Sequence, residues 1–297
     1  MRRTSKSNFN LLGRHTYFVP NVPELLVLLL WFILGALLAN LVNFVVSMLL
    51  APEASREVAL MAAYPVMFIP PMLYASTKSR YRCLRRSGAR LDSSNFGGAG
   101  AFVYILAAMA GTLALAFCAD AASSLLPAMP QNLKDILDSM VSGNLLVNLL
   151  CVSIFAPFFE EWLCRGMVLR GLLGNNVKPF WAIFISALFF ALIHLNPWQA
   201  LPAFLLGALF GYVYYKTGSL KLTMLMHFTN NTFALVMSRI PEFKDMDTWR
   251  DVLPGREFFV ILACCILITA LVVLRFVRIE LKSDKGNIDE VPALFEQ

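Results

Sequence analysis

The chain has 297 residues, of which 58% are hydrophobic and 15% are charged, and its formal net charge is +6. Soluble domains contain about 45–50% apolar and about 25% charged residues, so this composition excludes an ordinary soluble domain and indicates a polytopic membrane protein. The basic residues lie in short stretches between apolar runs, which argues against a nucleic-acid partner. The predicted fold class is an all-α bundle of about eight transmembrane helices.

Eight apolar runs approach the length of about 20 residues that a membrane-spanning helix needs. They cover residues 25–50, 57–76, 99–126, 144–173, 179–195, 200–215, 221–238 and 257–277. The second run contains Pro65, Pro70 and Pro71, so its helix is expected to be kinked or to end early. Residues 131–140 carry apolar side chains on one side and charges on the other, which predicts a short helix at the membrane surface.

Basic residues gather in five regions that flank these runs. They are the N-terminal arm, the 78–90 loop, the segment from Arg165 to Lys178, the turn from Lys216 to Lys221 and the segment from Arg275 to Lys282. With eight spans all five fall on one side of the membrane, and the positive-inside rule makes that side cytoplasmic. We therefore expect a multi-pass integral membrane protein with both termini in the cytoplasm. His15, in the basic arm, is expected to be solvated.

The fourth run places ionisable residues inside an apolar helix. Glu160, Glu161 and Arg165 occur within it, and ionisable groups at membrane depth usually face other helices or water. Glu161 and Arg165 are four apart, so they share a helix face and can pair. Glu160 instead has Cys164 four residues later. The spacing predicts one carboxylate held in an ion pair and one free for chemistry. An ordinary cluster of interfacial charges is the plain alternative.

Two histidines, His194 and His227, lie in later apolar runs. A lone histidine on an apolar helix is more often a structural hydrogen-bond donor than a catalytic group. Two of them, after a run that carries glutamates, favour a shared polar site. Asn231 follows His227 by four residues, so both side chains leave one helix face. A carboxylate, two imidazoles and an amide are therefore expected to converge inside the bundle.

Such a set suits peptide-bond hydrolysis, which needs a base for water, an acid for the leaving amine and donors for the oxyanion. Glu160 is the candidate base, and Asn231 and a histidine N–H are the candidate donors. A metal-assisted version is the alternative, because Glu160, His194 and His227 have the ligand count of an open catalytic zinc site. Glu161 would then act as the base. No His-Glu-x-x-His pattern is present to support zinc independently.

Three motifs, in this order, resemble the CPBP family of intramembrane endopeptidases: Glu160-Glu161-x-x-x-Arg165, Phe190-x-x-x-His194 and His227-x-x-x-Asn231. That family comprises the type II CAAX prenyl endopeptidases and the bacteriocin-processing or immunity proteins called Abi. The resemblance covers about residues 145–235. It implies a bundle of about eight spans, a glutamate that activates water, and histidines and an asparagine that stabilise the intermediate. It also leaves the zinc question open, since members have been called metalloproteases.

On this interpretation the chain divides into five parts. They are a cytoplasmic arm (1–24), N-terminal transmembrane helices (25–143), a catalytic transmembrane core (144–238), a last loop and helix (239–281) and a cytoplasmic tail (282–297). The expected function is an endopeptidase acting on a membrane-associated or hydrophobic peptide within the lipid bilayer. A non-catalytic immunity or scaffold protein of the same fold, and a proton-coupled transporter with a glutamate–histidine relay, are the alternatives.

Overall fold

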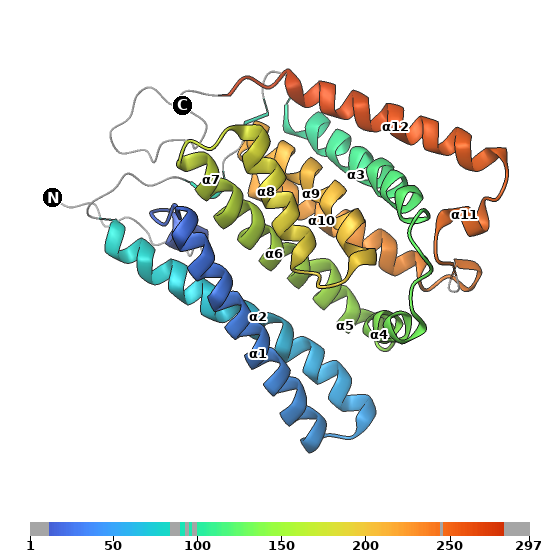
Figure 1. The fold of residues 1–297 in the computed structure, drawn as a ribbon, viewed down its shortest axis with the longest axis horizontal. Coiled ribbons are helices and arrows are strands. Elements are labelled where there is room, and N and C mark those ends of the chain that lie inside the picture. The colour runs from blue at the N-terminus through green and yellow to red at the C-terminus, as the bar shows by residue number, and fades with distance from the viewer. Residues whose placement is uncertain (1–11, 84–89, 93–94, 97–99, 244–245, 282–297) are drawn as a thin grey trace.

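The computed structural model describes residues 12–83, 90–92, 95–96, 100–243 and 246–281, and every regular element in these ranges is a helix. Figure 1 shows them as a bundle. The long helices are α1 (Val22–Leu49), α2 (Pro52–Arg82), α3 (Ala101–Ser123), α8 (Pro179–Leu192), α9 (Pro197–Thr217), α10 (Leu220–Met237) and α12 (Arg256–Val277). Two short helices, α4 (Gln131–Val141) and α11 (Trp249–Val252), lie in the connections between long helices. A 3-10 turn at Leu12–His15 precedes α1, and another at Pro241–Phe243 follows α10.

The central element is one continuous helical rod from Leu145 to Gly174, here called the core helix. It consists of α5 (Leu145–Asn148), a π-helical segment (Leu149–Phe155), α6 (Ala156–Glu161), a second π-helical segment (Trp162–Leu169) and α7 (Arg170–Gly174). All residues of the second π segment are buried. The core helix packs against α2, α8 and α10, so its polar residues face other helices.

The all-α membrane bundle is confirmed, and each of the eight apolar runs forms a helical segment. Among the described residues, five helices are long and apolar enough to cross a membrane: α1, the part of α2 from Arg56 to Arg82, α3, the core helix and α12. Of the eight expected spans, α8, α9 and α10 do not meet this criterion of length and composition. The clearest exception is α8, which has 14 residues and covers roughly 21 Å, against about 30 Å for a bilayer core. Its outward face is nonetheless apolar, with Phe180, Trp181, Phe184, Ile185, Leu188 and Leu192 exposed.

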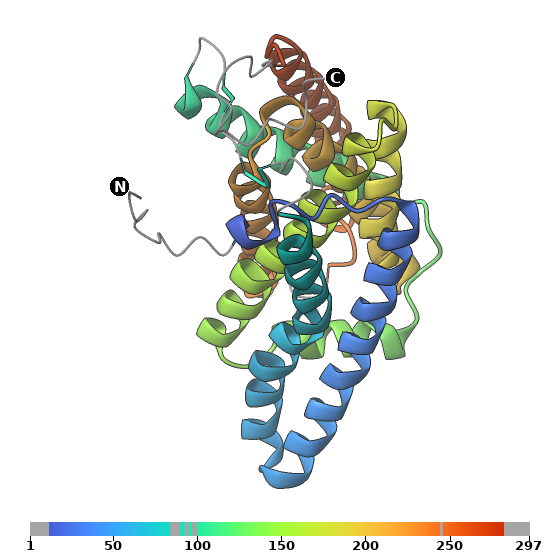
Figure 2. The same cartoon turned by 90° about the vertical axis from the view of Figure 1, so that its left-hand side faces the viewer.

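The prolines of the second run do not end its helix. α2 continues from Pro52 to Arg82 with Pro65, Pro70 and Pro71 inside it. It pairs with α1 along its length as a hairpin, which Figure 2 shows in blue and teal. Each of these prolines removes a backbone hydrogen bond and destabilises the helix, and the contacts with α1 stabilise it. The helix also extends into the predicted 78–90 loop, of which residues 84–89 lie outside the described residues.

Contacts between distant segments show that the basic regions lie at one end of the bundle. Asn175, after α7, donates to the carbonyl of Pro20, before α1. Asn95 donates to the carbonyl of Glu280, after α12, and its own N–H bonds to Thr217 at the end of α9. The eight segments therefore alternate in direction, and the segments next to both termini lie at the same end.

The segment before α1 is bound to the core helix by a buried cation. Arg170 is fully buried, and its guanidinium donates to the carbonyls of His15, Thr16 and Phe18. His15 is also buried, 2% exposed, with its ring edge against Trp162 and Nε2 near the carbonyl of Met72. The expectation of a solvated His15 is therefore wrong, because the arm folds back onto the core.

We predict that Arg170→Met loosens this segment from the bundle. Hydrogen bonds to charged groups contribute about 1.5–3 kcal/mol each, so the free energy of unfolding should fall by about 3 kcal/mol. The measurement is thermal stability in detergent together with limited proteolysis between residues 13 and 20. Arg278→Met, at an exposed arginine, is the control. Unchanged cleavage of the segment in folded Arg170→Met would contradict the prediction.

Candidate active site

The two glutamates end α6, at the point where the core helix changes from α-helical to π-helical geometry. Single π turns in helices occur frequently at functional sites. Here both partners of the predicted ion pair are fully buried: Arg165 Nη1 lies 2.7 Å from Glu161 Oε1, and both side chains are 0% exposed. The expected local pair is therefore present in the structure.

Arg165 joins the core helix to α8 and α9. Its Nη2 donates to the carbonyl of Gly207 at 2.9 Å, and its guanidinium lies over the rings of Phe190 and Phe210. A Cβ at position 207 would lie 3.3 Å from Arg165 Nη2 and 3.0 Å from the Phe190 ring. Glycine at this position therefore lets the α9 backbone approach the buried cation closely enough to accept its hydrogen bond.

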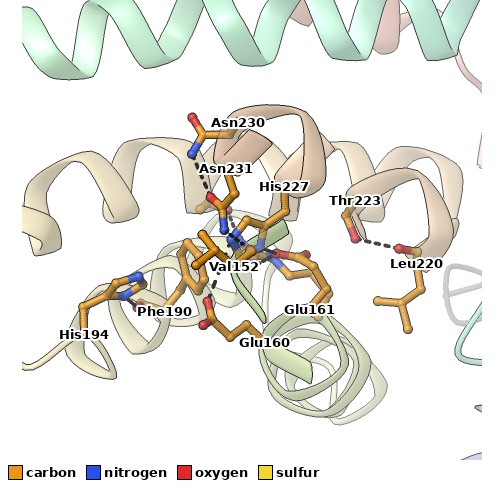
Figure 3. Close-up of polar contacts among 12 residues, drawn as sticks. Val152, Glu160, Glu161, Phe190, His194, Leu220, Thr223, His227, Asn230 and Asn231 are labelled. Atoms are coloured by element: carbon orange, nitrogen blue, oxygen red, sulfur yellow. Dashed lines mark hydrogen bonds and ion pairs between the residues drawn. The ribbon is translucent and has the colours of Figure 1, made fainter. Parts of the chain in front are cut away.

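His227 contacts both glutamates from α10, as Figure 3 shows. Its Nδ1 lies 3.2 Å from Glu161 Oε1, and its Nε2 lies 3.9 Å from Glu160 Oε2. A carboxylate oxygen only accepts, so Nδ1 carries the proton and Nε2 of the neutral ring is an acceptor. Glu161 therefore fixes both the orientation and the tautomer of His227, a role beyond its pairing with Arg165.

Glu160 is placed differently from its neighbour. Its Oε1 accepts a hydrogen bond from the hydroxyl of Tyr64, on α2. Its Oε2 is buried and has no hydrogen-bond partner among the described residues. Because no cation of the core helix contacts Glu160, the carboxylate presents one held oxygen and one oxygen that faces His227. This agrees with the expectation that Glu160 is the carboxylate outside the local ion pair.

Asn231 lies one turn after His227 and holds the backbone of the core helix. Ala156 N–H bonds to the Cys151 carbonyl, a spacing of five residues. At that spacing the donor for the Val152 carbonyl would be Pro157, which has no N–H. Asn231 Nδ2 donates to this carbonyl at 2.9 Å, and Asn230 Nδ2 donates to Asn231 Oδ1 at 3.1 Å. The Asn231 amide therefore replaces a missing helical hydrogen bond. This bond holds the amide against the core helix, which carries both glutamates.

His194 lies at the edge of this cluster. The edges of its ring and of the His227 ring both meet Phe190, with ring centroids 5.1 and 5.4 Å from that ring. Figure 3 shows His194 apart from Glu161 and His227, with Phe190 next to it. Its Nδ1 lies 2.8 Å from the carbonyl of Phe190, so Nδ1 is the protonated nitrogen and Nε2 is left for other partners. The structure thus places His194 beside the site rather than in direct contact with either glutamate.

The residues predicted to bind zinc do not fit a metal ion in this arrangement. Within the part of the chain that the structure describes, no three His, Cys, Asp or Glu side chains are close enough together to hold one. Glu160 is bound to Tyr64, Glu161 to Arg165, and each of the two imidazoles contacts the Phe190 ring.

The site contains functional neighbours that the motifs did not indicate. Tyr64 comes from a helix 96 positions away in the sequence, and Asn230 orients the neighbouring amide. Phe190, which begins the second motif, contacts the rings of both histidines. A polar tyrosine inside an apolar, proline-containing run was the one sequence signal for Tyr64.

Residues 142–233 match the family model described as type II CAAX prenyl endopeptidase Rce1-like. All six predicted site residues, Glu160, Glu161, Arg165, His194, His227 and Asn231, lie within the match. This agrees with the resemblance to the CPBP family, and it supports a CAAX-type intramembrane protease fold for this segment. No curated protein and no solved structure matches the chain.

We predict that Glu161→Gln destabilises the folded protein. The substitution leaves Arg165 buried without its counter-charge, and removing one partner of a buried pair costs about 3–5 kcal/mol. The double variant Glu161→Gln, Arg165→Met should regain part of that loss. Thermal stability in detergent measures both, with Glu257→Gln on exposed α12 surface as control. A single variant as stable as wild type would show that the pair does not support the fold.

Proposed function

We propose that this chain, whose residues 142–233 match the Rce1-like family model, is an intramembrane endopeptidase that hydrolyses a peptide bond of a membrane-associated or hydrophobic peptide. The observation that carries the proposal is the pair of atoms Glu160 Oε2 and His227 Nε2, which face each other at 3.9 Å. Both side chains are largely buried between the core helix and α10.

A separation of 3.9 Å suits one water molecule that binds both atoms, at about 2.8 Å from each. Glu160 Oε2 and His227 Nε2 are both acceptors in the states described above, so the water donates one proton to each. Its lone pairs are then directed away from both groups and toward an incoming carbonyl carbon. Burial keeps these hydrogen bonds in a medium of low dielectric, which strengthens them.

The reaction follows from these positions. As the water oxygen bonds to the carbonyl carbon, Glu160 takes a water proton as general base, and the carbonyl oxygen becomes an oxyanion. Asn231 has a second amide N–H besides the one bound to Val152, and this donor stabilises the oxyanion. When the C–N bond breaks, Glu160 returns the proton to the leaving nitrogen. The products are a carboxyl group and an amine.

The membrane setting limits the substrate class. Apolar side chains are exposed over most of α1 and α12, as expected for helices in contact with lipid, and exposed apolar surfaces of this extent are rare in soluble monomers. A substrate that reaches a site between such helices must itself be soluble in, or bound to, the bilayer. We propose that the basic end of the bundle, with both termini, faces the cytoplasm.

The orientation has a direct test. Single cysteines at Lys178, at the basic end, and at Leu125, after α3, should react from opposite sides of the membrane, with Lys178→Cys labelled only from the cytoplasm. Both positions are exposed, so labelling reports topology rather than burial. Labelling of Lys178→Cys from outside by an impermeant maleimide would overturn the proposed orientation.

We predict that Glu160→Gln lowers turnover by about 10²–10⁴-fold, because a general base contributes about that much. The variant should remain folded, since Gln can still accept the Tyr64 hydrogen bond. Mass spectrometry of membrane peptides from cells with wild type or Glu160→Gln identifies the substrates, and purified protein in liposomes gives the rate. Glu257→Gln is the control. Equal trimming of peptides by wild type and Glu160→Gln would refute the protease and favour a non-catalytic role.

A further inference from the structure

A residue from outside the Rce1-like segment takes part in the site. Tyr64 lies on α2, and its hydroxyl donates to Glu160 Oε1, whereas the match covers residues 142–233 only. This is the one hydrogen bond to the Glu160 side chain among the described residues. The general base is therefore held by a helix of the N-terminal half.

The ring of Tyr64 is fixed by an aromatic stack that begins next to Glu160. Tyr64 packs on Phe68, with ring centroids 5.8 Å apart. Phe68 stacks on Phe159 at 5.0 Å, with an interplanar angle of 13°. Phe159 directly precedes Glu160 in α6, so α2 and the core helix share one stack that sets the distance between the hydroxyl and the carboxylate.

The hydrogen bond determines which oxygen of Glu160 is available. A glutamate side chain has several rotatable bonds, and without a partner its carboxylate samples several orientations. A donor on Oε1 restricts the carboxylate to the orientation in which Oε2 faces His227 Nε2 at 3.9 Å. Hydrogen bonds to an ionised acceptor are about twice as strong as neutral ones, so this restriction is effective.

We propose that Tyr64 is a positioning residue of the active site, which holds Glu160 Oε1 so that Oε2 can take the proton from water. This rests on the proposed function. Tyr64 binds Oε1, and the water is proposed to bind the other oxygen, Oε2. Tyr64 acts through Glu160, and the N-terminal helices are thereby part of the catalytic unit.

The proposal predicts a specific kinetic change in Tyr64→Phe, which keeps the ring and its stack. We expect kcat to fall by about 10–100-fold, the range for a reacting group displaced by about 1 Å, with KM unchanged. The pH dependence of kcat should change as well, because the lost donor is a direct hydrogen-bond partner of the Glu160 carboxylate. The other titratable groups around it are His227 on α10, Glu161 and Arg165 on its own helix, and the thiol of Cys164. None of them is altered by the substitution.

The experiment uses full-length protein in liposomes and an internally quenched library of hydrophobic peptides as the probe. Tyr74→Phe, on the same helix and stacked on Trp31, is the matched control and should behave as wild type. A second readout is independent of activity. The infrared carboxylate band that Glu160→Gln removes should shift in Tyr64→Phe and not in Tyr74→Phe.

The outcomes separate this inference from the proposed function. If Glu160→Gln is inactive while Tyr64→Phe matches wild type in kcat, pH profile and infrared band, Tyr64 has no positioning role and the protease assignment stands. If Glu160→Gln keeps full activity, the proposed function is wrong. The infrared shift then still decides whether Tyr64 holds Glu160. A fall in kcat with no change in pH profile or band would show a merely structural role and overturn the inference.

Discussion

The buried ion pair between Glu161 and Arg165 is the interaction on which the arrangement of the core depends. A charge inside an apolar bundle is stable only when a counter-charge and hydrogen bonds compensate its desolvation. Arg165 meets this requirement with Glu161 at 2.7 Å and with the carbonyl of Gly207 on α9. The same carboxylate accepts a hydrogen bond from Nδ1 of His227 on α10. One pair thus joins the core helix to two further helices, and the position of His227 follows from the need to satisfy the pair.

The two adjacent glutamates have separate roles because they face different helices. Glu161 is enclosed, with 0% side-chain exposure, whereas the Glu160 side chain is 14% exposed and contacts α2 and α10. The π-helical geometry on both sides of α6 supports this division. It leaves the Val152 carbonyl opposite a proline, and so creates the acceptor that fixes the Asn231 amide. Irregular backbone of this kind is stable within a membrane only where other protein groups satisfy it.

The parts of the site that depend on local spacing could be predicted from the sequence. The i,i+4 rule places Glu161 beside Arg165, and His227 and Asn231 on one face of α10, which matches the contacts that both make with the core helix. Contacts between distant segments could not be predicted in this way. Tyr64 carries no motif, and His15 looked solvated because nothing local shows that Arg170 binds the neighbouring carbonyls. Sequence position also does not give the length of α8, so the place of His194 beside Phe190 did not follow from the apolar runs.

The short helix α8 has a consequence for the lipid around the protein. Its apolar outer face is exposed, yet 14 residues span roughly 21 Å, about 9 Å less than a typical hydrocarbon layer. Lipids beside such a helix adapt by thinning, at a cost of fractions of a kcal/mol for each ångström of mismatch. The turn after Leu192, which carries His194, is the end of α8 that such thinning would bring closer to headgroups and water. A change in membrane thickness would therefore change how much water reaches the edge of the site at which His194 lies.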